Sequence, residues 1–408
     1  MKKEGDDSLY YNYNLFKKKA LDCLQINQQI FIDMRRAFHK IPELSRREFK
    51  TSDLIQKILE KNGINYQSNI GEETGIVALI NDSNKNKTIA LRADIDALPI
   101  KEETNLPYAS NHHGIMHACG HDFHIASVLA TGIILNQCRE MLPGNVKIIF
   151  QPAEEDGPLG GAKQMIKDGV LENPKVDAIF AMHVFPDVPK GLVAVLNGPT
   201  MAAVDNFKIR IVGRGGHGAC PEETIDPVTI AGHVILTFNS LLSRRISPLD
   251  SAVISIGKIQ GGNRRNIIPD EVFLEGTMRT LDKNTRNNLK KIIKKACEMT
   301  CFSHGGKCIF QWIKSFDVTI NDKDAANIVR QGIENFINKE AIYEAAKPFM
   351  AAEDFSYYLK EIKGAYFWVG YKTIGSQPLH SAKLIIDEEV LLVGINTFLG
   401  IISEYFKK

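Results

Sequence analysis

Residues 146–157 read Val-Lys-Ile-Ile-Phe-Gln-Pro-Ala-Glu-Glu-Asp-Gly, an apolar run that passes directly into a cluster of carboxylates. The run has the length and the β-branched and aromatic content typical of a buried strand. Similar runs alternate with helical stretches along the chain, the strands at 75–80, 88–93 and 178–183 and the helices within 15–60 and at 124–139 and 161–168. This alternation predicts an α/β domain with helices on the faces of a sheet.

The pattern changes at about residue 202. From there to residue 316 the predicted elements follow the order β-α-β-β-α-β, with strands at 204–212, 252–259, 272–279 and 307–313 and helices at 226–242 and 283–300. This order is that of a ferredoxin-like α+β domain. We therefore expect two domains, an α/β domain built from residues 1–201 and 317–408 and an inserted domain built from residues 202–316.

The composition excludes several classes of protein. The 408 residues are 44% hydrophobic and 24% charged, as in ordinary globular domains, and 50 basic against 48 acidic residues leave a net charge of +2. A nucleic-acid surface needs a concentrated basic face, which this balance does not indicate. No run approaches the ~20 apolar residues of a membrane helix, and residues 1–19 lack the apolar centre of a signal peptide. We expect a cytoplasmic protein that binds neither nucleic acid nor membrane.

Seven cysteines, an odd number spread over the chain, argue against a disulfide framework and for a reducing compartment. Four residues of metal-ligating type do cluster, at Cys297, Cys301, His304 and Cys308. This cluster has two interpretations: a small zinc site, or a buried helix face that is followed by a strand.

The densest group of polar residues lies just before the apolar helix predicted at 124–139. It contains His117, Cys119, His121, Asp122 and His124 within eight positions. A thiol and an imidazole are suitable ligands for zinc, manganese or a similar divalent ion. Asp122 is placed to orient such a ligand from a second layer.

Carboxylates and histidines also follow several of the predicted strands. Glu154 and Glu155 are adjacent at the end of one strand, so they point in different directions, and one can bind a metal while the other acts as a base. Further candidates lie at other strand ends or in loops: Asp94, Asp96, His183 and His380. Because open α/β sheets place their sites at strand ends, these residues together indicate one metal-dependent site.

These residues match a known family. The chain resembles the M20 metallopeptidases, and within them the branch of N-acyl-amino-acid amidohydrolases, hippurate hydrolases and auxin-conjugate hydrolases. The resemblance runs in order from about residue 35 to the end, through the stretches 38–45, 92–99, 117–122, 151–157, 213–219, 266–269, 276–280, 353–355 and 379–381. It implies an α/β catalytic domain with a mixed sheet, like that of phosphorylase- and hydrolase-type folds.

The resemblance also implies a site with two divalent ions per subunit, which could be zinc, manganese, cobalt or nickel. The implied metal ligands are Cys119, His121, Glu155, His183 and His380. Glu154 would be the general base, and Asp94, Asp96 and Asp122 would support the ligands. Cys119 stands where other relatives carry a metal-bridging aspartate, which favours an amidohydrolase acting on N-acetyl-, N-benzoyl- or similar amino acids over a general aminopeptidase.

For the inserted domain, the resemblance implies a lid that also forms a homodimer. His217 would stabilise the oxyanion, in its own subunit or in the partner's. Asn266 and Arg279 would bind the substrate, with Arg279 suited to pair with its free carboxylate in a bidentate way.

Other classes of function are less well supported. Residues 213–218 satisfy the G-x-G-x-x-G pattern of a dinucleotide-binding oxidoreductase, but Pro221 and Pro227 oppose the helix that should open there, and no acidic residue follows at the required distance. No G-x-S-x-G marks a serine hydrolase. A non-catalytic metal-binding protein of the same fold would have no need for the base Glu154. A dipeptidase-like member of the family stays open as an alternative.

Overall fold

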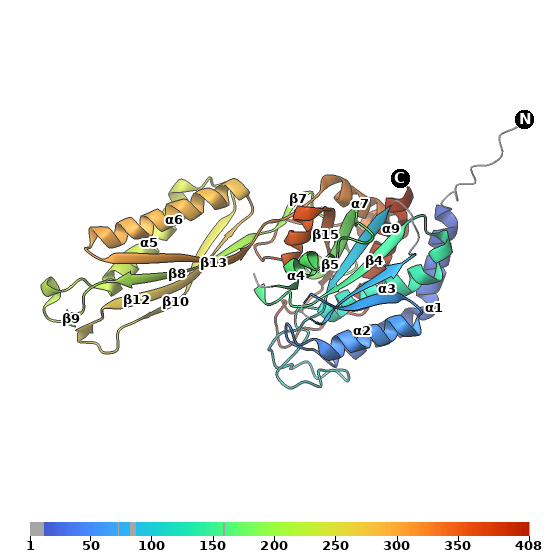
Figure 1. Ribbon diagram of the computed structural model, residues 1–408, viewed down its shortest axis with the longest axis horizontal. Coiled ribbons are helices and arrows are strands. Elements are labelled where there is room, and N and C mark those ends of the chain that lie inside the picture. The colour runs from blue at the N-terminus through green and yellow to red at the C-terminus, as the bar shows by residue number, and fades with distance from the viewer. Residues whose placement is uncertain (1–11, 72, 82–86, 158–159, 408) are drawn as a thin grey trace, which may run out of the picture. The chain divides into compact units, whose positions relative to one another are not determined.

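The computed structural model describes residues 12–71, 73–81, 87–157 and 160–407 (Figure 1). The chain divides into two compact units. The first contains residues up to 198 together with 320–347 and 357–408, and the second contains 199–319 and 348–356. The second unit thus extends slightly beyond the predicted 202–316 and includes a short segment from further along the chain.

The first unit is built on a seven-stranded mixed sheet with the order β1-β2-β4-β3-β5-β15-β6. Its strands are β1 (Asn65–Ile70), β2 (Gly75–Ile80), β3 (Thr88–Asp94), β4 (Asn145–Gln151), β5 (Ala178–Pro189), β6 (Val193–Ala194) and β15 (Lys363–Lys372). The four central strands β4, β3, β5 and β15 run parallel, and the outer strands are antiparallel to their neighbours. The mixed sheet confirms the predicted α/β class.

Helices cover this sheet. They are α1 (Tyr13–His39), α2 (Phe49–Lys61), α3 (His121–Gln137), α4 (Gly161–Lys167), α7 (Lys323–Phe336), α8 (Tyr358–Glu361) and α9 (Glu389–Lys407). Helix α3 is apolar around its whole circumference and is buried from its first residue to Leu135, because α1, α9 and the sheet all pack against it.

Helix α9 is longer and more apolar than the sequence analysis expected of any segment. Among the described residues, α9 is the one helix that is long and apolar enough to cross a bilayer by length and composition. However, 72% of its most apolar window is buried inside the unit, where α9 packs against α3 and α7. The apolar character of α9 therefore follows from its position in the core.

The second unit has the predicted ferredoxin-like arrangement. Its sheet has the antiparallel order β10-β12-β8-β13, formed by β8 (Ala203–Val212), β10 (Ala252–Gly261), β12 (Glu271–Thr280) and β13 (Lys307–Phe316). Helices α5 (Pro227–Arg245) and α6 (Lys283–Ser303) pack against one another and against this sheet, as Figure 1 shows. Two short strands, β9 (Gly216–His217) and β11 (Ile267–Ile268), pair beyond the end of the sheet. The chain passes between the units through β7 (Gly198–Met201) and β14 (Thr319–Asn321).

The glycine-rich stretch 213–218 does not open a helix. It contains a turn and the short strand β9, and α5 begins only at Pro227. A dinucleotide site needs a helix N-terminus directly behind the glycines to bind the pyrophosphate. The structure therefore does not support the oxidoreductase interpretation.

Candidate metal centre

All five predicted metal ligands lie in the first unit, near the carboxyl ends of its parallel strands. Cys119 and His121 lie at the start of α3, Glu155 follows β4, His183 lies within β5, and His380 lies in the loop before α9. Their ligand atoms form overlapping groups, each within 4.8 Å: Cys119 with His121 and His183, Cys119 with Glu155 and His380, and His121 with Glu154 and Glu155. Because the groups share members, the five residues form one continuous site.

The backbone at the start of α3 allows this convergence. Gly120 precedes the helix with φ of +81°, in the left-handed region, and an added Cβ would lie 2.4 Å from Val184 Cγ2. Glycine is therefore required by both the conformation and the space. The turn at Gly120 brings Cys119 and His121 onto the same site from either side.

Asp96 fixes two of the candidate ligands. His121 Nδ1 lies 2.9 Å from the carbonyl oxygen of Asp96, which leaves Nε2 directed at the site. The backbone N–H of Glu155 donates to Asp96 Oδ2 at 2.9 Å. One aspartate thus contacts both the imidazole of His121 and the backbone of the loop that carries Glu155.

Asp94 supports the site through another histidine. It is buried between Arg92, whose Nη1 donates to it at 2.7 Å, and His124, whose Nδ1 lies 2.6 Å away. The opposite nitrogen of His124 accepts a hydrogen bond from the N–H of Val184 at 3.0 Å. Because both nitrogens of His124 have partners, this histidine orders the site and is not available to a metal.

Several atoms at the site have no partner in the described residues. His121 Nε2 and Glu155 Oε1 are buried without a hydrogen bond. Glu155 Oε1 lies 3.9 Å from His121 Nε2 and 3.4 Å from His380 Nε2, and Cys119 Sγ lies 3.4 Å from His183 Nε2. Buried polar atoms are rarely left unsatisfied, so this convergence fits a divalent cation.

The electrostatics of the site also favour a cation. Burial, and then the charges of Glu155 and Glu154, raise the pKa of the Cys119 thiol well above its usual value. Burial lowers the pKa of His121, but the carboxylates of Asp94 and Asp96 outweigh it and raise this pKa to about 10. The same negative field that holds a proton on His121 would hold a metal ion in its place.

His183 supplies a neutral imidazole. Burial, together with the neighbouring His124, lowers the pKa of His183 well below its usual value. The ring centroids of these two histidines are 4.5 Å apart. A neutral imidazole retains the lone pair that a metal ligand needs.

Glu154 depends on a residue that the sequence analysis missed. The preceding residue, Ala153, has φ of +55°, which is unusual for a residue with a side chain. Glu48, buried at the start of α2, accepts hydrogen bonds from the N–H groups of Ala153 at 2.8 Å and Arg46 at 2.9 Å, and from the Thr74 hydroxyl at 2.8 Å. Glu48 therefore fixes the strained turn that carries the two carboxylates.

Asp122 does not support a candidate ligand directly. Its carboxylate lies 2.8 Å from His39 Nδ1 and 2.7 Å from Arg35 Nε, on helix α1. Although burial opposes ionisation, Arg35 and then His39 lower the pKa of Asp122 far below its usual value. The contacts of Asp122 with His39 and Arg35 join the start of α3 to α1. Asp122 therefore affects the metal ligands only through the position of α3.

The predicted substrate residues lie in the second unit and form two groups. His217 and Asn266 are together, because Gly218 donates its N–H to the carbonyl oxygen of Asn266 at 2.9 Å. Arg279 pairs with Val204 at the opposite end of β8. In the described part of the chain the half-buried Arg279 side chain has no hydrogen bond or ion pair, and burial lowers its pKa.

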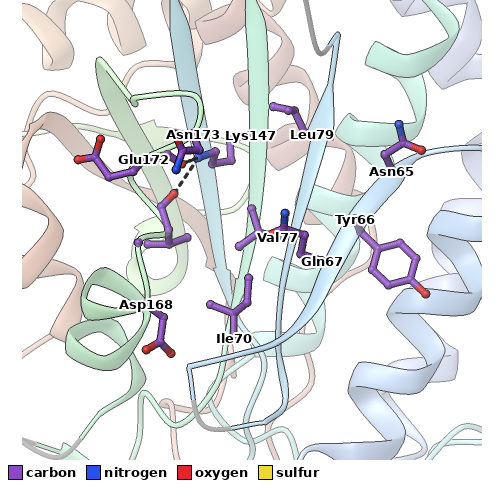
Figure 2. A pocket seen from close by; sticks show the side chains of 12 residues that line it. Asn65, Tyr66, Gln67, Ile70, Val77, Leu79, Lys147, Asp168, Glu172 and Asn173 are labelled. Atoms are coloured by element: carbon purple, nitrogen blue, oxygen red, sulfur yellow. Dashed lines mark hydrogen bonds between the residues drawn. The ribbon is translucent and has the colours of Figure 1, made fainter.

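A separate cavity of about 330 Å³ lies beside β1 and β2 and contains none of the predicted site residues (Figure 2). Lys147 is buried at this cavity, and its ammonium donates to the carbonyl oxygens of Val170, Glu172 and Pro174 at 2.6–3.0 Å. Burial lowers the pKa of Lys147 to about 8. Because the three carbonyls use all three ammonium protons, Lys147 stabilises the fold at this cavity.

The fold and the site together define a two-domain, metal-dependent hydrolase. The family model described as Peptidase family M20/M25/M40 matches residues 90–404, and the chain belongs to this family. This confirms the resemblance seen in the sequence.

Relatives along most of the chain agree with this family. The chain is 38% identical to "Thermostable carboxypeptidase 1" of Saccharolobus solfataricus, over 93% of the chain and 96% of that protein. It is 40% identical to "N-acetyl-L-cysteine deacetylase" of Bacillus subtilis, over 88% of the chain and 84% of that protein. The crystal structure of a dinuclear metal-binding peptidase of the M20 family from Bacillus subtilis superimposes with a TM-score of 0.82 and 36% identity, covering 94% of this chain and 99% of that one. The enzyme is therefore a metal-dependent hydrolase of amide bonds.

Proposed function

We propose that this enzyme cleaves the amide bond of N-acyl-amino acids, such as N-acetyl- or N-benzoyl-amino acids, with Glu154 as the general base. The observation that carries the proposal is the pair of adjacent carboxylates beside His121. Ligand atoms of Glu154, Glu155 and His121 lie within 4.8 Å of one another. One carboxylate can thus bind metal while its neighbour accepts a proton at the same site.

Cys119, His121, Glu155, His183 and His380 would hold two divalent ions, which could be zinc, manganese, cobalt or nickel. When bound, the ions would polarise the scissile carbonyl and lower the pKa of water. Glu154 would accept the proton of the attacking water at its carboxylate and pass it to the nitrogen of the departing amino acid. Glu154 is largely buried, with 9% of its surface exposed.

Arg279 is proposed to bind the substrate carboxylate. A guanidinium that is half-buried without an acidic partner among the described residues is suited to an anionic ligand. The names of both relatives above agree with a substrate that releases an amino acid: a carboxypeptidase and an N-acetylcysteine deacetylase. Asn266 would contribute an amide to the same kind of substrate.

The second unit is proposed to form a homodimer in which His217 serves the partner's site. Val204 lies opposite Arg279, and Val212 is the last residue of β8 before His217. The eight steps between them span about 26 Å at ~3.3 Å per residue. A small N-acyl-amino acid cannot contact both Arg279 and His217 of one chain across that length. A site that uses both residues would take them from two chains.

A dipeptidase-like activity is the second candidate, favoured by the similarity to a carboxypeptidase. A panel of N-acetyl-amino acids, N-benzoyl-amino acids and dipeptides, assayed with each reconstituted metal, separates the two. Faster release of amine from the acylated substrates supports the proposal, and exclusive cleavage of dipeptides contradicts it.

The role of Glu154 is tested by Glu154→Gln, with Glu155→Gln as the matched variant. The first should retain metal and lose roughly 10²–10⁴-fold in kcat, because an amide cannot accept the proton. The second should lower the metal content measured by elemental analysis, because it removes a ligand. A Glu154→Gln enzyme with activity within about tenfold of the wild type would exclude Glu154 as the base.

A further inference from the structure

Three cysteines of the second unit converge at one point, on elements that do not contribute to the proposed chemistry. Cys297 and Cys301 lie one turn apart on α6, and Cys308 lies near the start of β13, which packs against that helix (Figure 1). All three sulfur atoms lie within 4.8 Å of one another, and Cys297 Sγ is 3.3 Å from Cys308 Sγ. The turn between the two elements, at Gly305 and Gly306, returns the chain directly over the helix end.

Packing alone accounts for only part of this arrangement. Cys297 and Cys301 are fully buried and lie in the apolar core beneath the sheet, where a thiol acts as a small hydrophobic group. Cys308 is half-buried at the margin of that core, yet its sulfur meets the other two. Three sulfurs directed at one point are the pattern of a thiophilic cation site.

We propose that Cys297, Cys301 and Cys308 bind a zinc-class divalent cation in the second unit. With Zn–S bonds of about 2.3 Å, two sulfurs on a tetrahedral ion are about 3.8 Å apart. The three sulfurs here already lie within 4.8 Å of one another, so small side-chain shifts would suffice. On binding, three S–H bonds release their protons to solvent and each sulfur donates a lone pair to the ion. The fourth coordination position of the ion faces the less buried side of the cluster, next to Cys308, and is filled from that side.

The charge of the site favours a divalent over a monovalent ion. Three thiolates leave a net charge of −1 around a divalent ion and −2 around a monovalent one, and burial penalises the larger charge more.

A disulfide is the competing chemistry of this cluster. It would have to draw Cys297 and Cys308 from 3.3 Å to about 2.05 Å and would leave Cys301 outside the bond. The ion uses all three sulfurs, whereas the disulfide uses two. The two outcomes therefore differ in thiol count and in mass.

The test uses the full-length protein, reduced and stripped of metal, titrated with Cd²⁺ as the probe. Metal content after gel filtration and sulfur-to-cadmium charge-transfer absorption are measured for the wild type and for Cys301→Ser, Cys308→Ser and Cys220→Ser. Cys220 lies in the same unit outside the cluster and is the matched control. A Cys119→Ser protein measured in parallel identifies the absorption that belongs to the candidate metal centre.

We expect the wild type and Cys220→Ser to bind about one more Cd²⁺ per chain than Cys308→Ser, with most of the absorption lost in that variant. Amide hydrolysis by zinc-loaded Cys308→Ser should stay near the wild-type level, so the result does not depend on the proposed function. Cys308 is at the margin of the core, so its variant remains informative if Cys301→Ser fails to fold. Equal Cd²⁺ binding by wild type and Cys308→Ser, or loss of two thiols and 2 Da on mild peroxide treatment without extra metal uptake, would overturn the proposal.

Discussion

Replacing Glu48 should impair the candidate metal centre even though Glu48 belongs to none of its ligand groups. Its carboxylate receives hydrogen bonds from Ala153, Arg46 and Thr74 and thereby holds the turn before Glu154. In Glu48→Ala all three donors lose their acceptor. The strained φ of Ala153 then loses the hydrogen bond made by its N–H, which leaves both following carboxylates less firmly held.

The size of the expected loss in stability follows from the burial of these donors. Ala153 and Thr74 are fully buried, so water cannot replace the lost acceptor without opening the core. A buried donor left unsatisfied costs about 1–3 kcal/mol, so these two together predict a loss of about 2–6 kcal/mol in the free energy of unfolding. Activity should fall by at least about tenfold, because a displacement of the base by about 1 Å is costly to catalysis.

Glu48→Gln is the matched control. Its amide oxygen can still accept from Ala153 and Arg46, and its NH₂ group can donate to the Thr74 hydroxyl oxygen. It should retain most activity and most of the stability. Glu48→Gln therefore separates the geometry of the turn from the charge of the carboxylate.

The stability of the metal-free wild type, compared with that of Glu48→Gln, should also depend on pH. Burial, and then the charge of Asp96, raise the pKa of Glu48 from 4.5 to about 7, so the folded protein binds the proton more tightly than the unfolded chain. The protonated Glu48 therefore contributes up to about 3 kcal/mol to the free energy of unfolding. This contribution is fully present below pH 4.5 and is lost as the pH rises through 7. The glutamine variant has no such loss, so its stability relative to wild type should increase as the pH rises.

The assay is urea unfolding of metal-free wild type, Glu48→Ala and Glu48→Gln followed by circular dichroism, at several pH values between about 5 and 8. Hydrolysis by the metal-loaded proteins is measured alongside. An alanine variant within about 1 kcal/mol of wild type and fully active would refute the role given to Glu48. A stability difference between wild type and Glu48→Gln that does not change with pH would refute the raised pKa.

Three further predictions concern other residues. Thiol reagents should label Cys119 faster in metal-free protein than in metal-loaded protein, although burial and the raised pKa of its thiol keep both rates below that of an exposed cysteine; equal rates would mean that Cys119 is not a ligand. Mixed inactive subunits carrying Glu154→Gln or His217→Ala should regain activity, since one site of the hybrid dimer holds both intact residues; inactivity despite proven subunit exchange would contradict a role across the dimer. Lys147→Met should lower the urea midpoint without changing kcat, because three carbonyls lose their donor.

The sequence predicts much of the architecture because many of its strands and helices have a local signal. The apolar run at 146–150 matches β4, and the predicted β-α-β-β-α-β elements of the inserted domain match β8, α5, β10, β12, α6 and β13 to within a few residues. The candidate ligands converge as expected, since parallel strands end at one edge of the sheet. These properties follow from short-range patterns that a single sequence contains.

Contacts between distant segments could not be predicted in this way. Nothing local distinguishes Glu48, at the start of a helix, from a solvated glutamate, and its partner Ala153 lies 105 residues away. Asp122 is adjacent to His121, but its side chain faces α1, a direction that the spacing alone does not give. His124 looks like a ligand in the sequence and loses that role only because Val184 and Asp94 occupy its nitrogens.

The first unit has a further property because its candidate ligands come from both sides of the insertion. Cys119, His121, Glu155 and His183 precede the second unit, whereas His380 follows it, and β5 pairs with β15 across the same gap. A bound ion would therefore cross-link two chain segments that are remote in sequence and would restrict the unfolded chain as a long loop closure does. A protease that cut once within the insertion would leave two fragments still joined through the sheet and the metal.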